Sequence, residues 1–177
     1  MKKLTLSVLA CFAVAASAVA GVATSGKSYK EYKGDVEETC FNDQELQLDL
    51  FGSHTWQNGS GYDDGFGGGI GVNYFFMRYV GIGVDGNVYD GGVHGLWNVS
   101  SSLIVRFPID SVCLAPYILA GGGVQTDGKT VGTWHAGGGL EYRVVPHKIG
   151  LFAEGRYIWG ADDDESAQAR LGVRVVF

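Results

Sequence analysis

Proline is scarce in this chain of 177 residues, which has only three, whereas glycine is abundant at 29. Glycine-rich sequences with little proline, mixed with valine and aromatic residues, favour β-strands over disorder or a collagen-like repeat. Long hydrophobic runs are also lacking after Ala23. Because a transmembrane helix needs about 20 consecutive apolar residues, any membrane span beyond this point has to be built from strands.

Basic residues are too few for a nucleic-acid-binding protein. Two of the 13 Lys and Arg residues, Lys2 and Lys3, belong to the N-terminal segment, and the remaining 11 stand against 19 Asp and Glu, a net charge near −8. Without a basic patch the chain is a poor partner for the phosphate backbone, so we expect no nucleic acid among its partners.

Metal-binding and cofactor-binding motifs are absent as well. The four histidines and the cysteines are scattered, without the spacing of a metal site. The glycine runs at 67–71 and 121–123 are not followed by a predicted helix, so they do not form phosphate-binding loops. We therefore expect neither a metal ion nor a cofactor.

The N-terminal segment predicts export. A basic start is followed by an apolar run, Leu4–Ala16, that is too short for a membrane helix, and small residues suitable for signal peptidase come next. We expect a signal peptide over residues 1–20, cleaved after Ala20, with a lipoprotein signal at Cys11 as the alternative. The polar stretch over residues 21–43 lacks periodicity and predicts a periplasmic lead-in.

Two cysteines, Cys40 and Cys113, remain after this processing. An even number of cysteines in an exported chain is typical of a disulfide. The alternative is that both are small unpaired residues.

The rest of the chain alternates apolar and polar residues with the period of two that places them on opposite faces of a strand. In the last stretch Leu171, Val173 and Val175 share one face, while Arg170 and Arg174 share the other. Seven earlier segments show the pattern, although the fifth leaves its two faces unassigned. The predicted strands are Glu45–Trp56, Gly65–Met77, Tyr79–Tyr89, Leu96–Phe107, Pro116–Gln125, Thr133–Val144, Ile149–Trp159 and Ala169–Phe177.

Two kinds of barrel fit this alternation: a soluble one with the apolar face inside, and a transmembrane one with that face outside. The aromatic residues favour the second. All four tryptophans fall near one end of the strands on the apolar face, and other aromatics fall near the opposite end, as membrane interfaces select. The predicted girdles are Trp56, Trp97, Trp134 and Trp159 at one end, and Tyr74, Phe76, Phe107, Tyr142 and Phe177 at the other.

The polar face also favours a transmembrane barrel, because it mixes charges of both signs. An arginine facing lipid at mid-depth costs about 2–4 kcal/mol, whereas charges inside a narrow barrel can pair. The predicted network in the lumen comprises Asp49, Asp85, Arg106, Glu141, Arg143, Glu154, Arg156, Arg170 and Arg174. Glycines in the same strands make room for these long side chains.

The connections between strands give the third argument. Those near Arg78, Asp110 and Pro146 are mostly short, whereas the acidic, glycine-rich ones lie at the tryptophan end. Outer-membrane barrels have short periplasmic turns and longer external loops. We therefore predict an all-β, eight-stranded, antiparallel, up-and-down transmembrane β-barrel over residues 44–177. Its Tyr62, Asp90 and Asp162–Glu165 loops would face outward.

The residues also resemble a known family, the small eight-stranded outer-membrane barrels related to outer-membrane protein A and the opacity-type surface proteins. The likeness rests on Ala115–Gly123, Ala136–Arg143, Ala153–Tyr157 and the terminal Val175–Phe177. It implies a bacterial outer-membrane location, with outer-membrane lipid and lipopolysaccharide as surroundings. It also implies that Phe177 is an assembly signal read by the barrel-assembly machinery.

Catalytic motifs of lipid A-modifying barrels are incomplete. His135 is followed by Ala136 and Gly137, so the His-x-Ser pattern of the lipid A deacylases is absent, and His54 shares the lipid-facing parity of Trp56. We expect a non-catalytic barrel with a structural or surface-interaction role and a lumen filled by charged side chains. The alternatives are a lipid A-modifying enzyme and a narrow pore.

Overall fold

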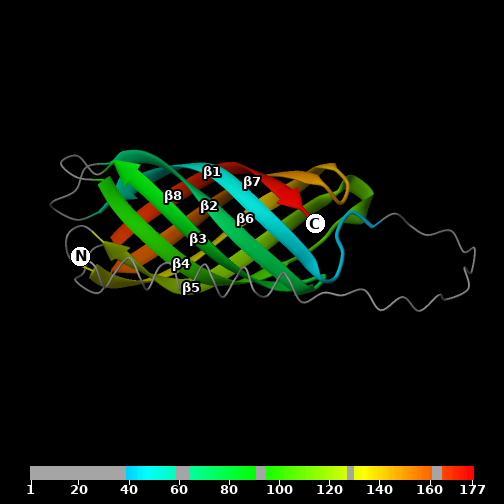
Figure 1. Ribbon diagram of the computed structural model, residues 1–177, viewed down its shortest axis with the longest axis horizontal. Helices are drawn as coiled ribbons and strands as arrows, with labels where there is room; N and C mark the ends of the chain where they lie inside the picture. Colours follow the sequence, from blue (N-terminus) through cyan, green and yellow to red (C-terminus); the bar gives the residue numbers. More distant parts are fainter. Residues whose placement is uncertain (1–38, 59–63, 91–94, 127–129, 161–164) are drawn as a thin grey trace, which may run out of the picture. The chain divides into compact units, whose positions relative to one another are not determined.

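Eight antiparallel strands form a closed barrel in which each strand pairs with its neighbours in sequence, and β1 pairs with β8 to close the ring (Figure 1). The strands are β1 (Glu45–Gln57), β2 (Gly65–Met77), β3 (Val80–Asp90), β4 (Gly95–Arg106), β5 (Leu114–Thr126), β6 (Thr130–Val145), β7 (Ile149–Gly160) and β8 (Glu165–Val176). One short 3-10 helix, η1 (Asp110–Val112), lies between β4 and β5. The predicted fold class, an eight-stranded up-and-down barrel, is confirmed.

The computed structural model describes residues 39–58, 64–90, 95–126, 130–160 and 165–177. The expected signal peptide 1–20, the lead-in up to residue 38, and the loop residues Tyr62 and Asp162–Asp164 lie outside these ranges, as does His94. Among the described residues, no helix is long and apolar enough to cross a membrane.

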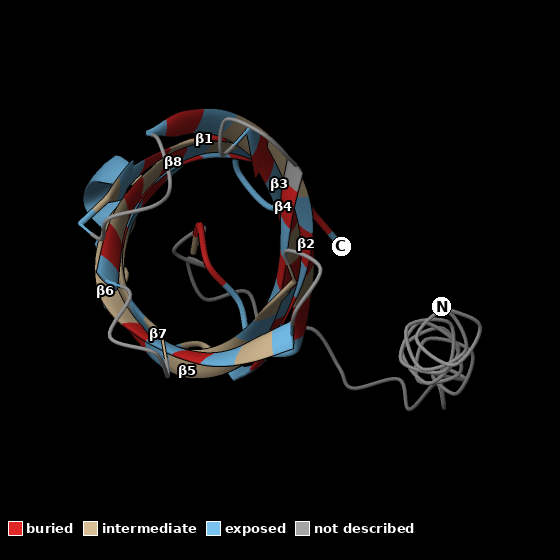
Figure 2. Ribbon diagram, turned by 90° about the vertical axis from the view of Figure 1, so that its left-hand side faces the viewer, coloured by how far each residue is buried: buried red, intermediate tan, exposed pale blue. Residues whose placement is uncertain are grey.

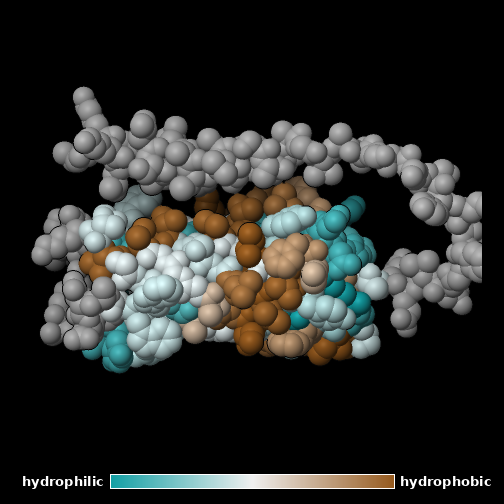
Figure 3. All heavy atoms as spheres, turned by 90° about the horizontal axis from the view of Figure 1, so that it is seen from below, coloured by the Kyte–Doolittle hydropathy of each residue, from teal (hydrophilic) through white to brown (hydrophobic). Residues whose placement is uncertain are grey.

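The strand alternation turns apolar side chains outward and polar ones inward. On β1, Leu48 and Leu50 are 44% and 66% exposed, whereas the alternate residues Gln47 and Asp49 are buried. Exposed and buried residues alternate in the same way around the ring (Figure 2). Hydrophobic side chains gather over the middle of the face seen in Figure 3, and hydrophilic ones gather toward one end. This surface suits a hydrocarbon environment and excludes the soluble barrel.

The exposed aromatic residues lie at two heights. Trp56, Trp97, Trp134 and Trp159 are exposed near the end where β1 finishes and β2 begins, which we call the tryptophan end. Tyr74, Phe76, Phe107, Tyr142 and Phe177 are exposed near the opposite end. Because residue 39 enters and Phe177 finishes there, we call it the terminal end.

The seam between β8 and β1 is longer than the sequence predicted. The predicted start of the last strand at Ala169 is wrong, because β8 begins at Glu165, which pairs with Trp159. Ser166 and Gln168 are buried on the same face of the strand as Arg170. This alternation indicates that the strand already runs through these residues, although the acidic residues before it suggested a longer loop. At the other end, the Phe177 N–H donates to the Leu46 carbonyl at 2.8 Å, so the two edges are joined along their whole length.

Strand β5, whose faces the sequence left unassigned, is apolar on both. Ala115, Tyr117 and Leu119 are buried in the lumen, whereas Ile118 is exposed. Alternation disappears from the sequence here because the lumen accepts apolar side chains beside the charged ones.

The outward face generates a test of membrane depth. We expect Val84→Arg, in the middle of β3, to lower the free energy of unfolding in phospholipid vesicles by about 2–4 kcal/mol, because an arginine at the midplane faces hydrocarbon. The matched control Val80→Arg has the same outward parity at the strand end and should cost only about 0–1 kcal/mol. Urea titration of both variants measures the difference. Equal losses of unfolding free energy would contradict the placement of Val84 at the bilayer midplane and Val80 near the interface.

Candidate functional site in the barrel lumen

All nine charged residues predicted for the lumen are buried inside the barrel. They come from six different strands, and they meet because alternate residues of every strand point to the common axis. Together with Glu45 they form two groups of ion pairs. The inner group, toward the terminal end, comprises Arg106, Glu45, Arg143, Glu141, Arg174 and Asp49, and the outer group comprises Asp85, Glu154, Arg156 and Arg170.

The inner group begins with a carboxylate that two arginines share. Glu45 accepts a hydrogen bond from Arg106 Nη1 at 2.8 Å and another from Arg143 Nη2. Arg143 also pairs with Glu141 at 2.7 Å, and Glu141 pairs in turn with Arg174 Nη1 at 2.6 Å. Each charge is therefore next to an opposite one, which is the condition for keeping ions in a poorly hydrated interior.

A two-pronged pair completes the inner group. Arg174 donates through Nε and Nη2 to the two oxygens of Asp49, each at 2.7 Å. Asn73 Nδ2 donates to the same carboxylate at 2.8 Å. This fork geometry fixes the guanidinium plane as well as its position.

The outer group is centred on Asp85. Its two oxygens accept from Arg156 and Arg170, each at 2.9 Å, and Ser100 donates to it at 3.1 Å. Glu154 accepts from Arg156 and, at 2.9 Å, from the Tyr117 hydroxyl. Asp85 is therefore the residue whose loss would leave most of this group unpaired.

Glu45 is a charged lumen residue outside the set predicted from the sequence. Without it the predicted set holds four carboxylates and five arginines; with it the numbers are five and five, and the network is neutral. Its parity with Gln47 and Asp49 on β1 was the signal that could have identified it.

Aromatic rings separate the ion pairs and were also missed. The guanidinium carbon of Arg106 lies 3.8 Å from the ring centre of Phe75, that of Arg170 4.6 Å from Phe51, and that of Arg174 4.7 Å from Phe152. Guanidinium groups are attracted to ring faces, most strongly where water is excluded. The rings pair with the cations and fill the space between them.

Two glycines in the barrel wall leave space for inward-pointing aromatic rings. A Cβ at Gly139 would lie 2.7 Å from the ring of Tyr117, and one at Gly81 would lie 2.8 Å from the ring of Phe75. Any larger residue would displace the ring beside it. The glycine content of the strands is therefore matched to bulky inward side chains.

The remaining space in the middle of the lumen is small. A cavity of about 10 Å³ lies between the two groups, bordered by Asp49, Asp85, Arg156, Arg170 and Arg174. This volume suits a single water molecule.

The histidines of the described residues lie apart. His54 stacks on Phe66 outside the barrel, with ring centres 4.4 Å apart, while its neighbours Ser53 and Thr55 point into the lumen. The alternation of β1 therefore prevents His54 from using either hydroxyl. In the described parts of the chain, no group of three or more His, Cys, Asp or Glu side chains is placed to hold a metal ion.

His135 has a hydroxyl partner that its sequence neighbours did not reveal. Its Nε2 lies 2.8 Å from Oγ of Ser102, which comes from β4, two strands away. Both side chains are buried in the lumen. A serine beside a histidine is one part of a nucleophilic site. Among the hydrogen bonds of the described residues, none runs from His135 to a carboxylate that could orient it.

Cys40 and Cys113 are joined by a disulfide with Cα atoms 5.4 Å apart. The segment Thr39–Gln44, which we call the plug, differs from an exposed lead-in, because Cys40 and Phe41 are only 3% and 1% exposed. Viewed along the barrel, this segment lies within the ring of strands (Figure 2). The fold therefore begins before the first strand.

Comparisons with known proteins identify the architecture. No protein-family model and no curated protein matches the chain. Among solved structures, the Neisserial surface protein A is 21% identical with a TM-score of 0.60, covering 74% of this chain and 95% of its own. The N-terminal β-barrel domain of Pseudomonas aeruginosa OprF is 21% identical with a TM-score of 0.63, covering 77% and 99%.

Two further structures extend the comparison. Ail, the attachment invasion locus protein of Yersinia pestis, is 18% identical with a TM-score of 0.59, covering 76% of this chain and 99% of its own. A de novo designed transmembrane β-barrel is 21% identical with a TM-score of 0.57, covering 76% and 97%. These likenesses confirm the expected architecture of a small outer-membrane barrel and support the expected location in a bacterial outer membrane.

The outer group generates a test of the ion pairs. We expect Asp85→Asn to lower the free energy of unfolding by about 3–5 kcal/mol, because it leaves Arg156 and Arg170 short of a buried partner. Asp64→Asn is the control, since the exposed Asp64 accepts from the Gln57 N–H and should change stability by less than about 0.5 kcal/mol. Denaturant unfolding in the same detergent measures both variants. Similar small changes in the free energy of unfolding would contradict a stabilising role for the ion pairs of the outer group.

Proposed function

We propose that this protein is a non-catalytic barrel of the bacterial outer membrane, with a structural or surface-interaction role and a lumen closed to solutes. The observation that supports this most directly is the neutral set of five carboxylates and five arginines across the lumen, with room for about one water between its groups. Moving an ion through it would require breaking buried ion pairs, which costs about 3–5 kcal/mol each.

The orientation that we propose puts the terminal end in the periplasm. Its connections at 78–79 and 146–148 are short, as periplasmic turns of such barrels are. The tryptophan end then faces outward, with the end of β3 at Asp90 and the start of β8 at Glu165. The predicted loops at Tyr62 and Asp162–Asp164 would face outward with them. The two aromatic girdles would lie at the two interfaces, in contact with outer-membrane lipid and lipopolysaccharide.

A lipid A-modifying enzyme is the alternative that one observation favours, the contact between Ser102 and His135. Both residues point into the lumen, away from the lipid that such an enzyme has to reach. We expect lipid A acylation to be unchanged when the protein is expressed. Mass spectrometry of extracted lipid A checks this, and an altered acyl pattern that disappears with Ser102→Ala would overturn the non-catalytic role.

The closed lumen generates a conductance prediction. Purified protein in planar lipid bilayers should give no large, stable channels, because the ion pairs span the cross-section. Heat-modifiable migration on a gel, with boiled and unboiled samples compared, should establish that the same preparation contains folded barrel. Large, stable channels from folded protein would support the alternative function, a pore, instead.

The last residue generates an assembly prediction. Backbone hydrogen bonds join Phe177 to Leu46 at 2.8 and 3.2 Å, whereas its side chain is 67% exposed. If the ring is the signal read by the barrel-assembly machinery, Phe177→Ala should reduce folded barrel in the membrane fraction nearly as much as deletion of Phe177. Phe177→Tyr should assemble normally. Normal assembly of Phe177→Ala would show that the ring is not the signal.

A further inference from the structure

The terminal end of the barrel is covered by the plug, Thr39–Gln44, rather than by the strand turns alone. Phe41 packs against two arginines of the inner group. Its ring centre lies 5.1 Å from the guanidinium carbon of Arg106 and 4.9 Å from that of Arg143. The Asn42 carbonyl accepts from Arg106 Nη2 at 3.0 Å. The plug therefore lies on the inner ion pairs and separates them from the solution at this end.

Arg143 meets the plug through an aromatic ring. The ring of Phe41 lies beside its guanidinium, as it does beside that of Arg106. Guanidinium groups are attracted to ring faces, most strongly where water is excluded. Phe41 therefore helps to hold the plug against the inner group.

The backbone around the plug is also held against its local preference. Three described residues other than glycine have positive φ angles: Gln44 at 54°, Cys113 at 51° and His147 at 59°. Gln44 is where the plug turns into β1, and His147 hydrogen-bonds to Asn42 of the plug. Residues other than glycine adopt this left-handed conformation rarely, and mostly where the surrounding structure imposes it.

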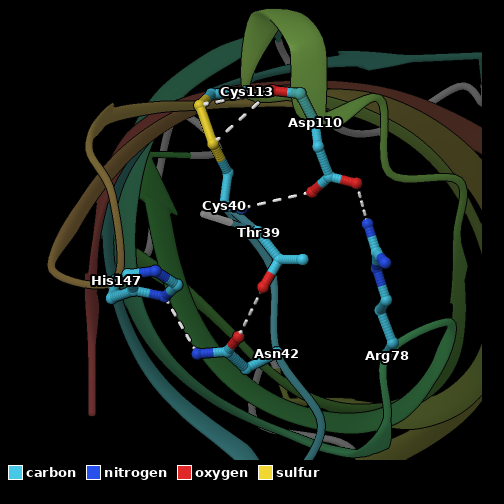
Figure 4. Close-up of a disulfide and its surroundings, with 7 residues drawn as sticks. All are labelled: Thr39, Cys40, Asn42, Arg78, Asp110, Cys113 and His147. Carbon is cyan, nitrogen blue, oxygen red and sulfur yellow. Dashed lines mark hydrogen bonds and ion pairs between the residues drawn. A yellow bond between two sulfur atoms is a disulfide. The ribbon is translucent and has the colours of Figure 1, made fainter. Parts of the chain in front are cut away.

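One covalent bond fixes the plug to the barrel wall. The disulfide joins Cys40 to Cys113, beside η1 and 73 positions along the chain (Figure 4). Asp110 supports the same contact: its Oδ1 accepts from the Cys40 N–H at 3.1 Å, and its Oδ2 pairs with Arg78 (Figure 4). Without the bond, the plug would be attached covalently only through its own ends.

We propose that the Cys40–Cys113 disulfide is a redox latch: a dithiol reductant opens it, the plug leaves the terminal end of the barrel, and the inner arginines become accessible to water. The latch adds a regulated state to the closed barrel. The proposed structural or surface-interaction role does not depend on it.

Exposure indicates where the exchange begins. Cys113 is partly exposed, whereas Cys40 is buried, so a thiolate of the dithiol attacks Sγ of Cys113. A mixed disulfide forms at Cys113, and Cys40 leaves as a thiolate that takes up a proton. The second thiol of the reductant then attacks its own sulfur in the mixed disulfide. Cys113 is released as a thiol, and the dithiol, which has lost two electrons, becomes a cyclic disulfide.

Hydrogen exchange on the folded protein tests the latch. Oxidised and dithiothreitol-treated barrels in the same detergent are compared by mass spectrometry, and maleimide labelling of Cys40 and Cys113 measures how far reduction has gone. We expect the amides of Cys40 and Asn42, which donate to Asp110 and Glu45, to exchange at least about tenfold faster after reduction. Exchange in β4 to β8 should not change.

Two variants separate the bond from the other plug contacts. The double variant Cys40→Ser with Cys113→Ser should exchange like reduced protein even without dithiothreitol. Phe41→Ala keeps the disulfide while removing the ring, so its plug amides should stay protected until the reductant is added. If the double variant fails to assemble, reduction of the wild-type barrel still decides the question.

Three results would overturn the proposal. One is unchanged plug exchange after complete reduction, because the other contacts would then hold the plug alone. Another is faster exchange throughout the strands, because the bond would then stabilise the whole barrel. The third is resistance of the disulfide to dithiothreitol while the barrel stays folded, because no dithiol could then operate the latch.

Discussion

A charge that points into an eight-stranded barrel needs an opposite charge beside it, and the rest of this structure depends on that constraint. The interior of such a barrel is just wide enough for side chains to fill, so it holds little water to screen an ion. Glu45 and Asp85 meet the requirement by each serving two arginines. With the ions paired inside, the opposite parity of every strand is free to be apolar and to face lipid.

The same crowding explains the composition of the wall and the closure of the terminal end. Aromatic rings and the backbone carbonyls of the neighbouring strands leave no space for a Cβ at Gly81 or Gly139, so glycine is needed there. Phe41 adds a ring from outside the strands and covers Arg106 and Arg143. A designed barrel shares this architecture, so the fold itself does not carry a role, and function has to be argued from the lumen and the plug.

Periodicity was sufficient to locate the strands, but it was insufficient to identify every side chain that fills the lumen. Seven predicted strands overlap the observed ones within a few residues at each end, and the eighth was begun too late, at Ala169 instead of Glu165. The faces of β5 could not be read because Tyr117 and Leu119 are apolar residues in a charged lumen. Glu45 and the inward rings of Phe51 and Phe152 had the correct parity, but parity alone does not say whether a side chain near a strand end or among apolar neighbours reaches the network.

The sequence by itself determined that the chain forms eight strands, of which all but the fifth have charged or polar residues on one face and apolar residues, with the aromatics sorted by height, on the other, because side-chain direction alternates along any strand. Only the tertiary structure decided which charges meet. Ser102 and His135 are 33 positions apart, and Arg174 and Asp49 are 125 apart, yet the closed ring brings each pair within hydrogen-bond distance. Strand register and tilt set these partnerships, and they depend on all eight strands together. The burial of Phe41 likewise follows from the shape of the opening it fills.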